Sequence, residues 1–220
     1  MTSLEERIRR AVQEEVAIVP YDPRWPESFR QERDHLRSCL PNELVRRIEH
    51  FGSTAVPGLP AKPIVDMLVE VTDLEATKAR IAPILESQGY DYFWRPTVGD
   101  NTPPFYAWFI KRNANRIRTH HIHMVEATFH EHWERLRFRD YLIAHPEAAS
   151  EYARLKTRLA AAHPEDRVAY TEGKSEFIGR IMSLIRQTSI TLSPGPRFNT
   201  ETANKIGERL QNPKTRQSKS

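Results

Sequence analysis

The chain has 220 residues and a formal net charge of +4, and 39% of its residues are hydrophobic. This length is enough for one sizeable domain with its own core, together with tails. The single cysteine, Cys39, excludes an intrachain disulfide and a cysteine zinc cluster. Because there is no apolar signal segment at the N-terminus and no long apolar run, we expect a cytoplasmic protein without a membrane span. The mild positive charge permits a polyanionic partner but does not require one.

The first part of the chain alternates between helical and strand patterns. Apolar residues that recur every three or four positions predict helices, and short runs rich in Val, Ile and Leu predict strands. In chain order, we expect a helix over residues 3–16, a helix over 26–40, a strand over 44–51, a loop over 52–60, a strand over 64–71 and a helix over 74–88.

The second part of the chain begins with strands and ends with helices. Strands are expected over 90–94, 105–111 and 118–125, and helices over 129–144, 147–162 and 165–187. This order predicts an α/β (or α+β) fold in which a mixed sheet is flanked by helices, with a C-terminal helical block. We expect an N-terminal helical extension over 1–15, one domain over 16–187 and a disordered basic tail over 188–220.

The strand over 64–71 carries two acidic residues, Asp66 and Glu70. Side chains alternate along a strand, so Asp66, Leu68 and Glu70 share one face. Asp66 and Glu70 are four residues apart, which is roughly 13 Å on a regular strand. The two carboxylates therefore cannot easily bind one ion. Either they have two separate functional roles, or Asp66 is a hydrogen-bond acceptor in a turn and Glu70 is a solvated strand end.

A turn of small residues, Gly52, Ser53 and Thr54, follows the strand over 44–51. Small residues let backbone amides approach a phosphate, and the hydroxyl groups add donors. Lys62 lies between this turn and Asp66, and it is either a phosphate ligand or a solvated loop lysine.

Two histidines, His121 and His123, lie on one face of the strand over 118–125. They can bind a metal, a phosphate or a carboxylate, or they can be structural histidines with hydrogen bonds. Arg112, Arg116 and Arg118 add a basic patch that suits phosphate groups, although a solvated hairpin face is the simpler interpretation.

Several independent segments resemble the GrpB family, also called UPF0157. They are residues 19–26, 48–59, 61–66, 119–123, 138–142 and 169–178. The resemblance covers about residues 16–187 and implies a nucleotidyltransferase-like fold.

In the nucleotidyltransferase superfamily, a Gly-Ser pair precedes an Asp-x-Asp on a strand, a later strand supplies a further acid, and the acids hold Mg²⁺ against nucleotide phosphates. Gly52, Ser53 and Asp66 match this pattern, whereas Leu68 stands in place of the second acid. The later strand offers histidines instead of a clear carboxylate. The resemblance therefore implies the fold without the usual set of metal-binding acids.

A narrower resemblance is to fungal arginine-containing cyclodipeptide synthases, which are similar to GrpB-related proteins and are associated with an Asp-Asp-x-x-Glu motif. Asp66 and Glu70 match the first and last positions of this motif, and Met67 departs from the second. This resemblance implies catalytic roles for Asp66 and Glu70, no cofactor and no metal, and aminoacyl-tRNA substrates that include arginyl-tRNA.

The first functional interpretation is a synthase that condenses two aminoacyl-tRNA-activated amino acids, one of them arginine, into a cyclic dipeptide for secondary metabolism. The alternatives are a Mg²⁺-dependent nucleotidyltransferase of the GrpB family and a non-catalytic module of the same fold that holds a nucleotide or coenzyme A. The residues expected to bind substrate are Gly52, Ser53, Thr54, Lys62, Arg116, Arg118, His121 and His123.

Overall fold

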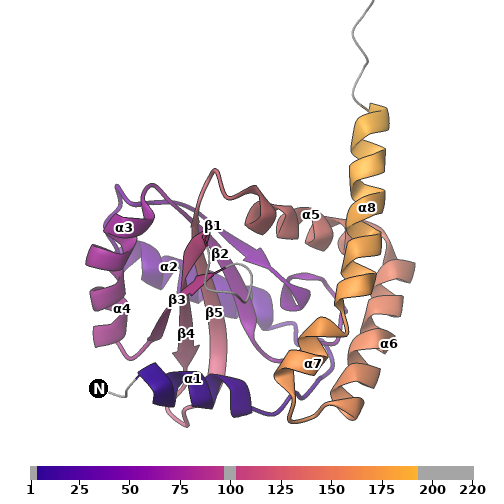
Figure 1. Ribbon diagram of the computed structural model, residues 1–220, viewed down its shortest axis with the longest axis horizontal. Coiled ribbons are helices and arrows are strands. Elements are labelled where there is room, and N and C mark those ends of the chain that lie inside the picture. The colour runs from indigo at the N-terminus through magenta and orange to yellow at the C-terminus, as the bar shows by residue number, and fades with distance from the viewer. Residues whose placement is uncertain (1–3, 97–102, 193–220) are drawn as a thin grey trace, which may run out of the picture. The chain divides into compact units, whose positions relative to one another are not determined.

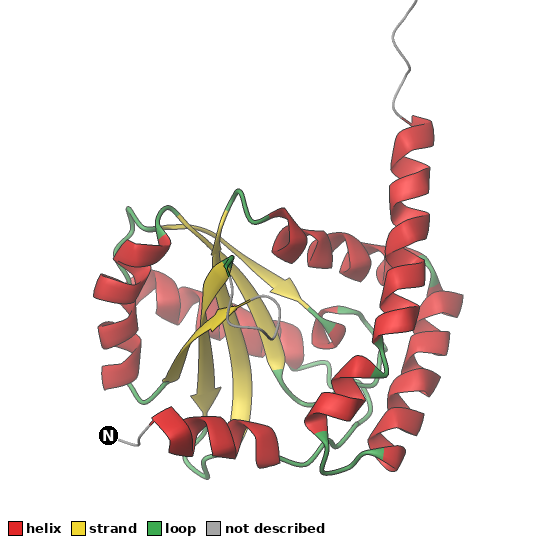
Figure 2. Cartoon of the chain, viewed as in Figure 1, coloured by secondary structure: helices red, strands yellow, loops and turns green. Residues whose placement is uncertain are grey.

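The computed structural model describes residues 4–96 and 103–192 (Figure 1). The elements are α1 (Leu4–Gln13), α2 (Trp25–Cys39), β1 (Val45–Phe51), η1 (Ser53–Ala55), β2 (Val65–Val71), α3 (Leu74–Ala76), η2 (Thr77–Ile81), α4 (Ala82–Ser87), β3 (Asp91–Pro96), β4 (Phe105–Arg112), β5 (Arg118–Glu126), α5 (His130–Ala144), α6 (Pro146–Ala162), α7 (Arg167–Glu172) and α8 (Ser175–Leu192). The expected α/β class, with a mixed sheet flanked by helices and a C-terminal helical block, is confirmed (Figure 2).

The chain divides into two compact units, Met1–Ile185 and Arg186–Ser220, and every site residue discussed below belongs to the first. Of the tail predicted to be disordered over 188–220, residues 188–192 belong to helix α8, so the prediction is wrong for them. Residues 193–220 lie outside the described residues, as do residues 97–102 of the connection between β3 and β4. Within the described ranges, no helix is both long enough and apolar enough to cross a membrane.

The five strands lie in the order β1-β2-β5-β4-β3. Only β2 and β5 are parallel neighbours, and the other neighbouring pairs within the described sheet are antiparallel. The register of the parallel pair places Asp66 opposite His121 and Leu68 opposite His123. This pairing brings the acidic residue of the first motif beside the histidines of a segment more than fifty residues later.

One face of the sheet forms the main core. Met67 and Val69 of β2, Ile122 of β5 and Phe109 of β4 have no exposed surface, and they belong to a cluster that includes Leu36 of α2. Burial of each such side chain contributes roughly 1.5–3 kcal/mol. This face therefore anchors the strands and fixes their register.

The opposite face of the sheet carries the polar residues, because alternation places Asp66, Leu68 and Glu70 there together. Leu68 packs with Tyr106 and Phe129 in a separate apolar cluster. The expectation that these three residues of β2 share a face is consistent with this packing.

The C-terminal helices pack against the turn that follows β1. Val56 and Leu59 of this segment share an apolar cluster with Tyr152 of α6 and with Phe177 and Ile181 of α8. Because this packing holds α6 and the start of α8 close to Ser53, residues from the last third of the described chain can reach the sheet.

Two expected helices differ in the structure. The helix expected over 74–88 contains a π-helical segment, in which the amide of Ala82 donates to the carbonyl of Thr77. Pro83 follows directly, and proline has no amide hydrogen to donate within a helix. The helix expected over 165–187 is divided into α7 and α8 at Gly173. A Cβ atom at Gly173 would lie 2.4 Å from a methyl carbon of Leu159, so a larger residue at this position would require the side chain of Leu159 to move.

Candidate functional site

Gly52 and Asp66 form the centre of the site. The backbone turns sharply after β1 at Gly52, which has a φ of +73°. A Cβ atom at Gly52 would lie 2.4 Å from Oδ2 of Asp66. Glycine is therefore required here both for the backbone conformation and for the close approach of the turn to the carboxylate.

Asp66 lies in a chain of hydrogen bonds with His121 and Arg118. The distance from Nδ1 of His121 to Oδ1 of Asp66 is 3.0 Å, and Nη1 of Arg118 lies 3.0 Å from Nε2 of His121. Arginine is always a donor, so Nε2 accepts and Nδ1 donates its hydrogen to the carboxylate. The sequence predicted all three residues, and the structure brings them together.

The charge states of Asp66 and His121 follow from their surroundings. Burial raises the pKa of the Asp66 carboxyl, but the hydrogen bond from His121 and the nearby Lys62 and Lys174 outweigh burial and leave that pKa below its ordinary value. Burial lowers the pKa of His121 to about 4, against the opposing effect of Asp66. At neutral pH, Asp66 is therefore an ionised carboxylate and His121 a neutral imidazole.

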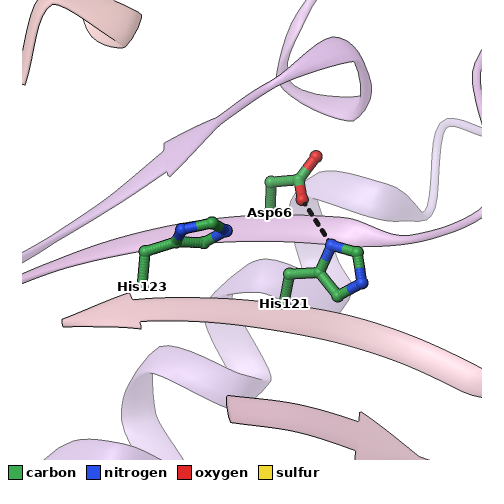
Figure 3. A group of neighbouring side chains, drawn as sticks. All are labelled: Asp66, His121 and His123. Carbon is green, nitrogen blue, oxygen red and sulfur yellow. Dashed lines mark hydrogen bonds and ion pairs between the residues drawn. The ribbon is translucent and has the colours of Figure 1, made fainter. Parts of the chain in front are cut away.

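His123 is the third member of a group of possible metal ligands. One ligand atom each from Asp66, His121 and His123 lies within 4.8 Å of the others. Figure 3 shows Asp66 and His121 pointing toward one another, with one ring nitrogen of His123 turned toward them. The sequence left metal binding open for the two histidines, and the narrower resemblance implied no metal; the structure places Asp66 beside both histidines.

Lys156 of α6 reaches the turn from the helical block. Its ammonium group lies 3.0 Å from Oγ of Ser53 and also donates to the carbonyl of Pro60. Lys156 is only 2% exposed, and burial lowers its pKa to about 7. The serine of the predicted phosphate loop, Ser53, therefore accepts a hydrogen bond from a buried lysine.

Two further lysines contact one tyrosine ring. The ammonium groups of Lys62 and Lys174 lie 5.3 Å and 4.5 Å from the centre of the Tyr170 ring. Burial, together with neighbouring positive charges, lowers the pKa of Lys62 to about 7, while burial lowers that of Lys174 to about 8. We refer to Lys62, Lys156 and Lys174 as the lysine cluster. Within the described part of the chain, none of the three forms an ion pair.

Positive charge also surrounds the cluster. Arg118 and Arg167 both form ion pairs with Glu14, at 2.8 Å and 3.3 Å, and Arg112 contacts the same carboxylate. Glu14 thus contacts three guanidinium groups, and Arg112 also pairs with Asp91, at 2.9 Å. Asp66 attracts the positive charges of all three lysines of the cluster. The arrangement carries a clear excess of positive charge, which favours a polyanionic ligand.

Three predicted site residues lie elsewhere or are already bonded. Thr54 is 1% exposed and its hydroxyl lies 3.0 Å from Nε2 of His50, so it is bonded inside the protein rather than presented to a ligand. Glu70 forms an ion pair with Arg47, at 3.0 Å, instead of joining Asp66. Arg116 lies in the exposed turn between β4 and β5, where its carbonyl accepts a hydrogen bond from Arg112.

Sequence reasoning assigned no role to Lys156, Lys174, Arg167 or Glu14. For Lys156 a signal was present. The buried stripe of α6 consists of Ala148, Tyr152, Lys156 and Ala160, which follow one another every four residues. A lysine in an otherwise apolar stripe is unusual, because burial of an ammonium group is costly. The other three residues give no comparable pattern, because only tertiary packing brings them to the site.

The comparisons with known proteins identify the family. The family model described as GrpB protein matches residues 15–184. The chain belongs to the GrpB family. The crystal structure of conserved protein GrpB from Enterococcus faecalis has the same fold, with a TM-score of 0.67 and 33% identity, over 79% of this chain and 99% of that chain.

Two curated relatives of this GrpB-family chain are informative. UPF0157 protein YqkA of Bacillus subtilis is 39% identical over 163 residues, which are 74% of this chain and 45% of YqkA. Dephospho-CoA kinase of Mycobacterium tuberculosis is 29% identical over 157 residues, which are 63% of this chain and 38% of that protein. The chain therefore matches less than half of the length of either relative.

Proposed function

We propose that this chain is a nucleotidyltransferase that holds the phosphate groups of a nucleotide on Ser53 and the lysine cluster. The observation that carries the proposal is that Lys62, Lys156 and Lys174 come together from three separate segments. The ammonium group of Lys156 lies 3.0 Å from Oγ of Ser53, and those of Lys62 and Lys174 lie against the ring of Tyr170. Membership of the GrpB family and the Gly-Ser turn before Asp66 support the same function.

The charge balance favours a ligand with several negative charges. Unpaired lysines at a buried site repel one another and lose hydration, which is why their pKa values fall. A single carboxylate would neutralise only one of the three ammonium groups, whereas a di- or triphosphate carries enough negative charge to balance all of them. The hydroxyl of Ser53 and the backbone at Gly52 add uncharged contacts to such a ligand.

The proposed step transfers a nucleotidyl group to an acceptor hydroxyl. The hydroxyl oxygen attacks the α-phosphorus, a new P–O bond forms, and the bond from that phosphorus to pyrophosphate breaks. Asp66 is ionised and accepts the proton of the hydroxyl group. The lysine cluster stabilises the charge on the departing pyrophosphate.

The magnesium site of the nucleotidyltransferase superfamily does not fit these residues. Mg²⁺ prefers oxygen ligands in octahedral geometry. Leu68 stands where the second carboxylate is expected and is fully buried, and β5 presents His121 and His123. Magnesium therefore has no part in the proposed transfer.

The cyclodipeptide synthase interpretation receives no support from the family match or from the relatives described above. Its two catalytic candidates also have different partners, because Asp66 bonds to His121 and Glu70 to Arg47. A synthase that acts on aminoacyl-tRNA substrates is therefore the first alternative. A non-catalytic module for a nucleotide or coenzyme A is the second alternative.

The test is to incubate the purified full-length chain with α-labelled ATP or CTP and RNA or protein acceptors, and to measure labelled product and pyrophosphate. We expect Asp66→Asn to lose transfer while retaining nucleotide binding, and Lys174→Met to weaken binding at least tenfold. Lys78→Met is the matched control, because Lys78 is exposed and contacts Trp94 rather than Asp66.

The possible outcomes separate the three alternatives. Tight binding of ATP, CTP or coenzyme A without turnover would identify a binding module. Cyclic dipeptides in a reaction with charged tRNAs, detected by mass spectrometry, would restore the synthase interpretation. If Lys174→Met binds each of these ligands as tightly as Lys78→Met does, the proposed phosphate site is wrong.

A further inference from the structure

We infer that Asp66, His121 and His123 form a binding site for a divalent transition-metal ion of the zinc or manganese type. The site takes the place of the magnesium site that the superfamily implies and that these residues do not fit. The inference deepens the proposed function, and only the role of the ion in transfer rests on that function; binding of the ion itself does not.

The first support is geometric. In a site with metal–ligand distances of about 2.0–2.2 Å, neighbouring ligand atoms lie roughly 3.0–3.5 Å apart. Oδ1 of Asp66 and Nδ1 of His121 are already 3.0 Å apart, and the His123 ligand atom lies within 4.8 Å of both. The ring nitrogen of His123 that is turned toward the other two side chains is the third ligand atom (Figure 3).

The ligands stand on rigid parts of the fold. Asp66 belongs to β2 and both histidines belong to β5, and these strands are directly paired. Residues with no exposed surface, such as Met67 and Ile122, lie beside them on the other face of the sheet. Metal ligands held by a packed sheet need little ordering when an ion binds.

The second support is independent of this geometry and concerns His123 alone. His123 is 8% exposed, and its Nδ1 has no hydrogen-bond partner among the described residues. The ring of Tyr106 stacks on the His123 ring and the ring of Phe51 meets it edge to face, each with a centre-to-centre distance of 5.3 Å. A buried polar atom without a partner is costly, and this Nδ1 is the nitrogen next to the Cγ atom of the ring. The other nitrogen, Nε2, is turned toward Asp66 and His121, so Nε2 is the ligand atom that His123 offers (Figure 3).

The donor set determines the class of ion. Imidazole nitrogen suits zinc, copper, iron and nickel, and carboxylate oxygen also suits manganese, whereas magnesium prefers oxygen ligands alone. Three protein ligands leave at least one coordination position open for a phosphate oxygen or water. The turn that carries Ser53 approaches the same carboxylate, because a Cβ atom at Gly52 would lie 2.4 Å from Oδ2 of Asp66. A polyphosphate held at Ser53 would therefore lie near that open position.

Arg118 competes with the metal. Its Nη1 donates to Nε2 of His121 in the structure. A metal ion bound to Nδ1 of His121 would leave the ring hydrogen on Nε2. That hydrogen would then face the N–H group of Arg118, which is also a donor, so the Arg118 side chain would have to turn away. The ion pair of Arg118 with Glu14 is made by Nε, at 2.8 Å, and does not involve the Nη1 atom that faces His121. Glutamine at this position offers an amide oxygen that accepts the Nε2 hydrogen, and such outer contacts strengthen metal binding.

The experiment titrates the untagged, full-length chain with Co²⁺ and Zn²⁺ after treatment with a chelator. Cobalt absorption reports imidazole ligands, and elemental analysis gives the number of zinc ions bound. We expect one ion per chain, at least tenfold weaker binding in Asp66→Asn and His123→Asn, and tighter binding in Arg118→Gln. His130→Asn is the matched control, because His130 is exposed on α5 and lies outside the ligand group.

Each outcome supports or overturns the inference. Circular dichroism and thermal melting confirm that the variants are folded, and Arg118→Gln adds a readout in which affinity rises. Unchanged zinc binding in His123→Asn, or the absence of a stoichiometric zinc ion in the parent chain, overturns the site, and so does preferential Mg²⁺ binding. Nucleotide binding measured with chelator present tests the lysine cluster separately, so the two proposals can fail independently.

Discussion

Replacement of Lys156 by methionine should stabilise the protein at low pH while abolishing ligand binding. Lys156 is 2% exposed, and burial lowers its pKa from 10.5 to about 7. At ~1.4 kcal/mol per pKa unit, this difference corresponds to a cost of about 5 kcal/mol for holding the charged form in the folded protein. Methionine has a similar length and no charge, so it removes that cost.

The lost hydrogen bonds reduce the gain. The ammonium group of Lys156 donates to Oγ of Ser53 and to the carbonyl of Pro60. Leaving these acceptors without a donor costs about 1–3 kcal/mol. We therefore expect Lys156→Met to raise the free energy of unfolding by about 2–4 kcal/mol at pH 6, which is the difference between these two estimates.

The sign of the effect should change with pH. The cost of the charge is fully present below the folded pKa of about 7 and declines as the pH rises toward 10.5, because the folded protein then holds a neutral amine. Above that range only the loss of hydrogen bonds remains, so Lys156→Met should be the less stable protein. The two curves of stability against pH must cross between these values.

Urea unfolding, followed by circular dichroism at pH 6, 7.5 and 9, measures this difference. Lys78→Met is the control and should show no pH-dependent change relative to the parent chain. A methionine variant that is less stable than the parent at pH 6 would refute the reasoning, since it would mean that the ammonium group of Lys156 is well compensated in the folded state.

Three further predictions concern neighbouring residues. Nucleotide binding should take up protons and weaken as the pH rises above 8. The pKa values of Lys62 and Lys174 are about 7 and about 8 in the free protein, and bound phosphates would favour the protonated form of both lysines. Calorimetry in two buffers of different ionisation enthalpy measures the proton uptake. Gly52→Ala should lower the free energy of unfolding by about 1–3 kcal/mol, since its φ is +73° and its Cβ would meet Asp66; an unchanged urea midpoint would contradict this. Glu14→Gln should cost about 2–4 kcal/mol, because Arg118 and Arg167 lose the carboxylate that they share, while Arg112 keeps its ion pair with Asp91. The urea midpoint is the measurement, and a loss that high salt does not reduce would argue against an ionic cause.

The part of the site on the sheet could be predicted from the sequence. The alternation of side chains on β2 and β5 identifies the faces of Asp66, His121 and His123, and a small-residue turn identifies Gly52. Such periodic signals come from local geometry. The pairing of β2 with β5, which places these residues together, is a property of the tertiary structure.

The part of the site on the helices could not be predicted in the same way. Lys174 lies where a single expected helix is broken into α7 and α8, at the point where Gly173 packs closely against Leu159 of α6. Arg118 looks like a residue of a solvated hairpin, yet it is 5% exposed because Glu14, from the start of the chain, covers its charge. Contacts between distant segments leave no periodic trace.

The hydrogen bond from Lys156 to Ser53 joins residues that are 103 positions apart. The site therefore exists only after the helical block has packed on the turn that follows β1. A ligand that contacts both the turn and the helical block stabilises their packing. A ligand that binds only the folded state raises its stability in proportion to the logarithm of its concentration. A melting-temperature screen of phosphorylated metabolites would thus detect the natural ligand without any assumption about the reaction, and Lys156→Met would identify the hits that act through this contact.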